Sequence, residues 1–139
     1  MNNKGNAYIL FITITFSITI LFFLIIFMLF MQINNQVYKL KQDVLYIVQN
    51  SYFSLNQESF SYSDYIIDNK ELFEKVNYIM QKNNPDGNVK IISMYYDYKK
   101  NKVNISYTLK LKPVVLGDII KDININFNDD IKLKGMEVE

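Results

Sequence analysis

The residues of this chain whose types could do acid–base chemistry are aspartates close to its C-terminal end. Asp118 and Asp122 form one candidate carboxylate pair, and the adjacent Asp129 and Asp130 form another. A pair of carboxylates held at a suitable separation can serve as general acid and general base. Acidic residues are also common at turns, and the sequence gives no indication of a pocket around these four. We therefore expect no catalytic site and no enzymatic reaction.

The same region contains a partial match to a calcium-binding loop. Asp122-x-Asn124-x-Asn126 has the alternating oxygen ligands with which such a loop begins. The loop also needs Gly at its sixth position and Glu at its twelfth, and here Phe127 and Leu133 occupy those positions. The polar face of a strand accounts for the spacing more simply, so we expect no metal site.

The composition of the chain excludes several classes of protein. Among its 139 residues there is no Cys and no His. Zinc sites built on those ligands, disulfides, Cys or His nucleophile–base pairs and haem bound through His are therefore excluded. The 15 basic residues nearly balance the 14 acidic ones, for a formal net charge of +1, whereas a nucleic-acid-binding protein collects a basic surplus on one face. We expect no nucleic-acid partner and no cofactor.

The strongest signal in the sequence is an apolar stretch near its N-terminus. Residues 5–38 are all uncharged, and Ala7–Met31 is almost wholly apolar. As a helix this stretch would be about 37 Å long, enough to cross a hydrocarbon core about 30 Å thick with some tilt. Lipid cannot hydrogen-bond the backbone, so a single spanning segment must be helical despite its many β-branched residues. The sequence predicts a short leader over residues 1–6 and a transmembrane helix over residues 7–31.

A cleavable secretory signal is the main alternative for this stretch. Such a signal has an apolar region of about 7 to 15 residues followed by a small-residue cleavage site. The stretch here is longer, and Gln32–Gln36 after it contains no such site. Lys4 lies before the span, and the nearest basic residues after it are Lys39 and Lys41. By the positive-inside rule we expect a cytoplasmic N-terminus, a lipid-bilayer partner and residues 32–139 outside the cell membrane.

Four small hydroxyl residues alternate within the predicted span: Thr13, Thr15, Ser17 and Thr19. Thr13 and Ser17 are four residues apart, as are Thr15 and Thr19, so each pair shares a helix face. In membranes such residues let helices approach closely and hydrogen-bond across an interface, which makes them a candidate helix-packing face. Alternatively each hydroxyl bonds back to a carbonyl of its own helix and needs no partner.

Residues 32–139 predict an α+β head that follows the span without a Gly/Ser linker. Apolar residues at helical spacing predict a helical stalk over residues 32–51, and the polar stretch Ser51–Ser63 predicts a loop. A second helix is expected to begin at the capping pattern Asp68–Glu71 and to end before the turn Asn83–Gly87. Each helix has one apolar stripe: Ile33, Val37, Leu40, Val44, Ile47 and Val48 in the first, and Leu72, Phe73, Val76, Ile79 and Met80 in the second.

After this turn the apolar residues recur with a period of two, which predicts strands. Val89–Tyr98 and Val103–Lys112 are expected to form a hairpin, and Ile123–Asn128 and Ile131–Lys134 two further short strands separated at Asp129–Asp130. The result is a three- to four-stranded, mostly antiparallel sheet whose apolar face the two helical stripes cover. That face is expected to consist of Val103, Ile105, Tyr107, Leu109 and Leu111 with their neighbours.

The N-terminus resembles type IV pilin-like proteins, in particular the TadE-like minor pilins, or pseudopilins. In those families a short basic leader ends in Gly and an uncharged helix follows at once; the matching residues here are Lys4–Gly5 and then Asn6–Phe11. The resemblance implies that a prepilin-type peptidase cuts between Gly5 and Asn6, and that the membrane helix continues into a spine packed on an antiparallel sheet. These families usually carry Glu at the fifth residue after the Gly, where it helps to register a subunit against its neighbour. This chain has Leu10 there.

From these features we expect a membrane-anchored, pilin-like minor subunit or assembly factor of a pilus or secretion apparatus. It would act by helix packing against other pilin-like or membrane-complex subunits. One alternative is a bitopic scaffold of cell division or secretion that is never processed and so keeps Met1–Gly5. Another is a membrane-tethered enzyme or ligand-binding module, which would need a deep pocket lined by Asp118, Asp122 or Asp129.

Overall fold

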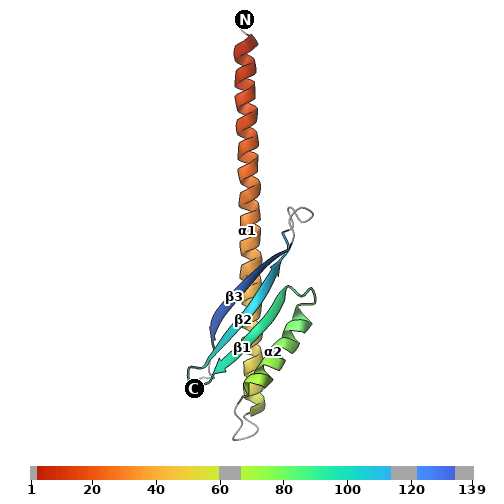
Figure 1. The fold of residues 1–139 in the computed structure, drawn as a ribbon, viewed down its shortest axis with the longest axis vertical. Coiled ribbons are helices and arrows are strands. Elements are labelled where there is room, and N and C mark those ends of the chain that lie inside the picture. Colours follow the sequence, from red (N-terminus) through yellow and green to blue (C-terminus); the bar gives the residue numbers. More distant parts are fainter. Residues whose placement is uncertain (1–2, 60–66, 114–121, 134–139) are drawn as a thin grey trace. The chain divides into compact units, whose positions relative to one another are not determined.

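The computed structural model describes residues 3–59, 67–113 and 122–133. Helices and antiparallel strands occur in separate parts of the chain, which is the α+β class that the sequence predicts (Figure 1). The chain divides into two compact units, residues 1–35 and residues 36–139. The elements in chain order are α1 (Asn3–Ser59), α2 (Asn69–Asn83), β1 (Val89–Asp97), β2 (Lys102–Leu111) and β3 (Ile123–Lys132).

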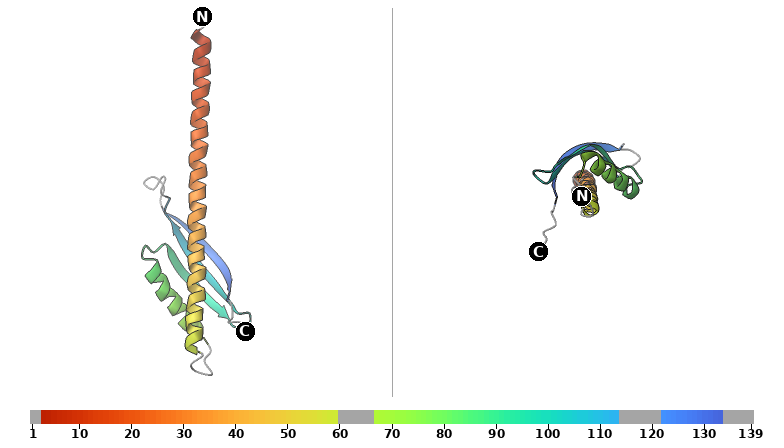
Figure 2. Two further views of the ribbon diagram at one scale, coloured as in Figure 1. Left: turned by 180° about the vertical axis from the view of Figure 1, so that it is seen from behind. Right: turned by 90° about the horizontal axis from the view of Figure 1, so that it is seen from below.

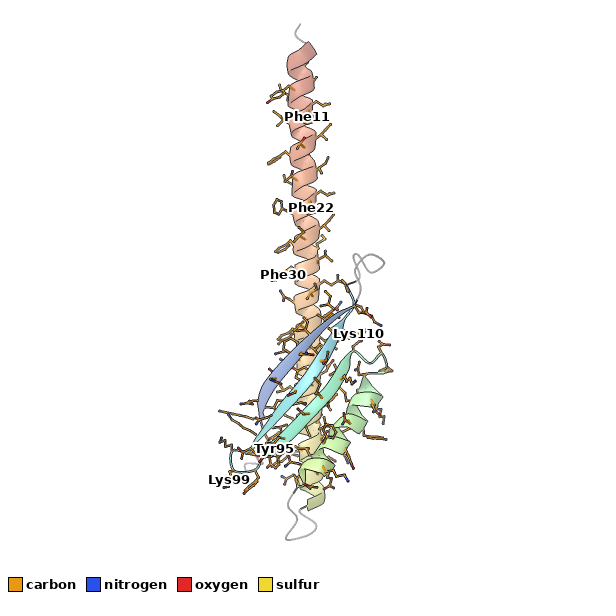
Figure 3. The ribbon with its side chains drawn as sticks, viewed as in Figure 1. Phe11, Phe22, Phe30, Tyr95, Lys99 and Lys110 are labelled. Atoms are coloured by element: carbon orange, nitrogen blue, oxygen red, sulfur yellow. The ribbon has the colours of Figure 1, made fainter. Side chains whose placement is uncertain are left out.

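The first unit is the N-terminal part of α1, and its apolar side chains are exposed on every side. Phe11, Phe22 and Phe30 are 67%, 61% and 62% exposed, and their rings project outward (Figure 3). Within the described residues α1 is the one helix that is long and apolar enough to cross a membrane, and no part of its most apolar window is buried. The first unit is therefore compatible with a single-pass membrane protein.

In the second unit α1 has one buried stripe. Val44, Ile47, Val48 and Leu55 are at most 3% exposed, and Ser51 lies in the same stripe with its Oγ donating to the Ile47 carbonyl at 2.7 Å. The predicted end of this helix was wrong, because α1 continues beyond residue 51 through a stretch that the sequence assigns to a loop. The physical reason is that Ser51 and Leu55 extend the buried stripe, and their burial outweighs the weak helix propensity of the polar residues around them.

The second helix, α2, begins at the predicted capping pattern and ends at Asn83, the first residue of the predicted turn. Asp68 precedes it in an extended conformation and its carbonyl accepts the Leu72 N–H at 3.0 Å, but the Asp68 side chain makes no capping hydrogen bond. The sequence therefore contains the capping-box pattern, but the Asp68 side chain does not form the hydrogen bond that the pattern predicts. Leu72, Val76 and Met80 are the buried residues of this helix.

The sheet has three antiparallel strands in the order β1-β2-β3. It curves over α1 and α2, which lie on the same side of it (Figure 2). The predicted apolar face of β2 is buried, since Val103, Ile105, Tyr107, Leu109 and Leu111 are all at most 2% exposed. The register of β1 shifts between Ile91 and Ser93, which leaves Ile92 as an extra residue that is 56% exposed. This bulge leaves the apolar side chain of Ile92 on the surface.

The C-terminal part of the sheet corrects another prediction. Residues 123–128 and 131–134 were expected to be two short strands with a turn at Asp129–Asp130. Instead β3 runs without a break from Ile123 to Lys132 and pairs with β2 along its length. The two aspartates fit within a strand because Asp129 faces inward, where it finds donors on α1 and β2.

Candidate functional site

The predicted leader-peptidase position lies at the N-terminal end of α1. Gly5 and Asn6, on either side of the predicted cleavage bond, are both helical in the structure.

Three of the four hydroxyl residues of the span bond to carbonyls of their own helix, whereas Ser17 makes no side-chain hydrogen bond to the described residues. Thr13 Oγ1 donates to the Ile9 carbonyl, Thr15 Oγ1 to the Phe11 carbonyl and Thr19 Oγ1 to the Thr15 carbonyl, each at 2.9 Å. This is the arrangement in which the hydroxyls need no neighbour. Because their donors are satisfied internally, Thr13, Thr15 and Thr19 can face hydrocarbon without leaving an unpaired hydroxyl proton, and their surface remains small and apolar.

An aromatic groove lies on the surface of the span. It has a volume of about 530 Å³, and a row of residues at helical spacing lines it: Ile20, Phe23, Leu24, Ile26, Phe27 and Phe30. These side chains offer no hydrogen-bonding group. The groove suits acyl chains or another apolar helix and offers nothing to a polar ligand.

In the second unit a charged cluster joins α1 to β2 and β3. Lys41 Nζ lies 3.2 Å from Asp129, and the Tyr107 hydroxyl donates to the same carboxylate at 2.5 Å. Lys41 Nζ also lies 4.2 Å from the centre of the Phe127 ring, which stacks on Tyr107. Burial, and then the hydrogen bond to Asp129, raise the pKa of Tyr107 above its ordinary value. The Asp129 carboxylate is thus occupied in holding three elements together.

A second polar cluster joins the ends of α1 and α2 to β1. The rings of Tyr52 and Tyr96 lie 5.5 Å apart, and the Tyr96 hydroxyl approaches the Tyr52 hydroxyl at 3.4 Å and Asn101 Oδ1 at 3.3 Å. Asn69 Oδ1 at the start of α2 accepts the backbone N–H of Tyr96 at 2.5 Å. Burial is the largest cause of the raised pKa of Tyr96. These contacts are structural.

The structure assigns separate surroundings to the predicted carboxylates. Asp118 lies outside the described residues. Asp122 Oδ2 accepts a hydrogen bond from Lys110 Nζ at 2.7 Å, which lowers the pKa of Asp122. Asp129 and Asp130 are consecutive in β3 and therefore point to opposite faces of the sheet. Neither Asp122 nor Asp129 lines any cleft described below.

The partial calcium loop is the exposed face of β3. Asn124 and Asn126 both lie on that face, and the Thr108 hydroxyl of β2 approaches Asn126 Oδ1 at 2.7 Å. Residues at alternate positions of a straight strand extend in a row and cannot wrap around an ion. Over residues 3–59, 67–113 and 122–133 there is no group of three acidic, Cys or His side chains that could hold a metal ion.

Sequence reasoning missed two neighbouring clefts between α1, the end of α2 and the turn that follows it. One has a volume of about 270 Å³ and a largely apolar lining: Leu40, Tyr46, Ile47, Met80 and Val89, together with the polar residues Asp43, Asn83 and Asn84. The other has a volume of about 400 Å³ and a charged lining: Gln36, Lys39, Leu40, Asp43, Asn83, Asn84, Pro85, Asp86, Asn88, Lys110 and Lys112. The lining comes from three distant segments, and only the turn Asn83–Gly87 was visible as a signal in the sequence.

The α1 wall of the charged cleft is fixed to β2 by one side chain. Gln36 Nε2 donates to the Lys112 carbonyl at 2.9 Å, and the Lys112 N–H donates to Gln36 Oε1 at 3.2 Å. The amide thereby pairs with the backbone just beyond the end of β2, as a neighbouring strand would. Comparisons of this chain with protein-family models, with curated proteins and with solved structures found no match.

Proposed function

We propose that this chain is a membrane-anchored, pilin-like minor subunit or assembly factor, which acts by helix packing rather than by catalysis. The observation that carries the proposal is the contrast within α1. Between Ala7 and Met31 the helix exposes apolar side chains all round, whereas its part in the second unit buries a single stripe under a sheet. A helix that is apolar on every side requires lipid or other apolar helices around it.

The proposed mechanism is an exchange of neighbours around the span. In the bilayer, acyl chains cover the aromatic groove at Phe23 and Phe27, and in an assembly the helices of other subunits take their place. Leu10 makes this exchange purely one of packing, because no carboxylate at that position needs a charged partner. The second unit, with its core of helices on a sheet, would determine which subunits meet.

The first test is the intact mass of the protein isolated from its native membrane. We expect the wild-type chain to lack Met1–Gly5, and a Gly5→Val variant to keep that segment because a β-branched residue then occupies the cleavage position. Asn3→Ala, which lies within the leader but away from the bond, is the matched control and should be processed normally. A full-length wild-type chain in the membrane would instead support the unprocessed scaffold. Recovery of the chain from the aqueous fraction would contradict anchoring altogether.

The second test asks whether the groove meets another helix. The chain has no Cys, so a single introduced Cys reports its own position. We expect Phe27→Cys on the groove to form disulfide-linked species under mild oxidation in the native membrane, and Leu21→Cys, which does not line the groove, to form fewer. Equal cross-linking at both positions would contradict a packing face at the groove.

A further inference from the structure

The charged cleft of the second unit contains unpaired charges of both signs. Of its three lysines, Lys110 is paired with Asp122 at 2.7 Å. Among the described residues, the other two lysines, Lys39 and Lys112, and the two carboxylates, Asp43 and Asp86, form no salt bridge within 4.0 Å. Two positive and two negative groups therefore line one cleft without forming a salt bridge with one another, and the charge of Lys112 also helps to lower the pKa of Asp122.

The turn that forms one wall of the cleft is well fixed. Asn84 Oδ1 accepts the Asn88 N–H at 3.1 Å, and Asn84 Nδ2 donates to the Val89 carbonyl at 3.2 Å. Asp86 lies within this turn, so its backbone is held in place at the cleft.

We propose that the cleft binds a zwitterionic phospholipid headgroup of the phosphoethanolamine type. Its ammonium has three N–H donors, which match the carboxylates of Asp43 and Asp86. Its phosphate matches the ammonium groups of Lys39 and Lys112. The balance of charges decides among headgroups. An anionic headgroup would leave both carboxylates uncompensated, and a choline headgroup has no N–H to donate to them.

The position of the cleft along the chain supports a lipid as the source of this headgroup, and here the inference rests on the anchoring in the proposed function. Gln36 is the first cleft residue of α1, and it follows Met31 by five residues, which can extend over at most about 18 Å. The polar headgroup layer on each side of a bilayer is about 5 to 8 Å thick. The chain itself would therefore keep the cleft within reach of the headgroups of a bilayer that holds Ala7–Met31.

The experiment uses the full-length chain in nanodiscs of three compositions: phosphatidylcholine alone, or with part of it replaced by phosphatidylethanolamine or by phosphatidylglycerol. Amide hydrogen exchange of residues 83–88 is the readout. We expect slower exchange in the phosphatidylethanolamine nanodiscs than in the other two. We also expect Asp43→Asn and Lys39→Gln each to reduce the preference for phosphatidylethanolamine at least about tenfold, which is the effect typical of losing a hydrogen bond to a charged group.

The matched control is Lys99→Gln, which removes an exposed lysine from the β1–β2 turn (Figure 3) and should keep the preference. Exchange of the buried β2 amides reports whether each variant is folded, so loss of the preference in an unfolded variant is not mistaken for loss of binding.

Three outcomes would overturn the proposal. Equal exchange in phosphatidylethanolamine and phosphatidylcholine would remove the need for N–H donors, and slower exchange in phosphatidylglycerol would show an anion site. Equal protection by free phosphoethanolamine, added to the chain in detergent without phospholipid, would assign the cleft to a soluble zwitterion. If the proposed function were wrong, the native membrane would instead yield a full-length chain, or the chain would be recovered from the aqueous fraction. The measurement with free phosphoethanolamine would still report whether the cleft binds this group.

Discussion

The two parts of α1 belong to one helix and follow opposite rules. From Ala7 to Met31 most apolar side chains are exposed, and no residue of the most apolar window is buried. In the second unit the apolar side chains form a single stripe, of which Val44 and Val48 are at most 1% exposed. The first part therefore requires apolar surroundings on every side. The second part requires one apolar face of a sheet against its buried stripe.

This difference determines which substitutions each part of the helix can tolerate. A stripe packed against a sheet responds to changes of shape and charge at individual positions, because its neighbours are fixed and dense. An apolar surface that meets fluid neighbours responds to total hydrophobicity and to charge, and much less to shape. The predictions below test this contrast.

The largest effect is expected from a charge introduced into each part. Val48→Asp buries an unpaired carboxylate in the core and should destabilise the second unit by about 4 kcal/mol or more. Phe23→Asp should leave the second unit folded and reduce membrane insertion by about 2.5 to 3.5 kcal/mol. Urea unfolding of the detergent-solubilised chain and a membrane-insertion assay measure the two. Should Phe23→Asp also unfold the second unit, the contrast between the two parts would be lost.

A smaller loss is expected at the charged cluster. Asp129→Ala removes the acceptor of the Tyr107 hydroxyl and the partner of Lys41, and should cost about 1 to 3 kcal/mol in the free energy of unfolding. Lys41 is partly exposed, so most of this cost belongs to Tyr107. In a double-mutant cycle with Tyr107→Phe we expect a coupling of at least about 0.5 kcal/mol. Asp130→Ala, on the outer face, is the control and should change stability little.

Alkaline pH should weaken the second unit and leave the span unaffected. Burial raises the pKa values of Tyr96 and Tyr107 above the ordinary 10.0, so above that pH the unfolded chain loses phenol protons that the folded chain keeps. Stability is therefore complete below about pH 10 and falls as the pH rises toward the folded pKa values. Unfolding curves should show a shallower decline for Tyr107→Phe. Tyr95→Phe, which alters a ring that is 56% exposed, should behave like the wild type.

The smallest effect is expected at the hydroxyls of the span. Thr13→Val and Thr15→Val remove hydroxyls that bond to carbonyls of their own helix, so the stability of the isolated chain should change by less than about 0.5 kcal/mol. The same variants are informative for assembly. A clear loss of cross-linked species in the native membrane would show that these hydroxyls also lie against a neighbouring helix.

Much of the second unit could be predicted from local patterns. The strict alternation of Val103–Lys112 determines β2 and its buried face, because a period of two leaves no other element. The turn residues Asn83–Gly87 end α2 for a local reason, and Gly87 does adopt a positive φ of 64°. Such predictions succeed where one segment contains the whole cause.

The errors occurred where the cause lies in another segment. Helix α1 continues beyond Ser51 because Leu55 finds a buried position, and β3 passes through Asp129 because Lys41 and Tyr107 supply its donors. The cleft residues were missed for the same reason, since no pattern in the sequence places Asn88 beside α1. The candidate site is therefore harder to predict from the sequence than the fold, because its residues come together only through tertiary contacts.

The amide pairing of Gln36 with Lys112 has a mechanical consequence. Lys112 directly follows β2, the central strand, which is hydrogen-bonded to a neighbour along both edges. A pull on α1 from its N-terminal side would therefore reach the sheet through its best-supported strand before it reached the edge strand at Asp129. Within the second unit, tension would be shared between two ladders of backbone hydrogen bonds from the outset, and such a domain would keep its shape while its tether is under load.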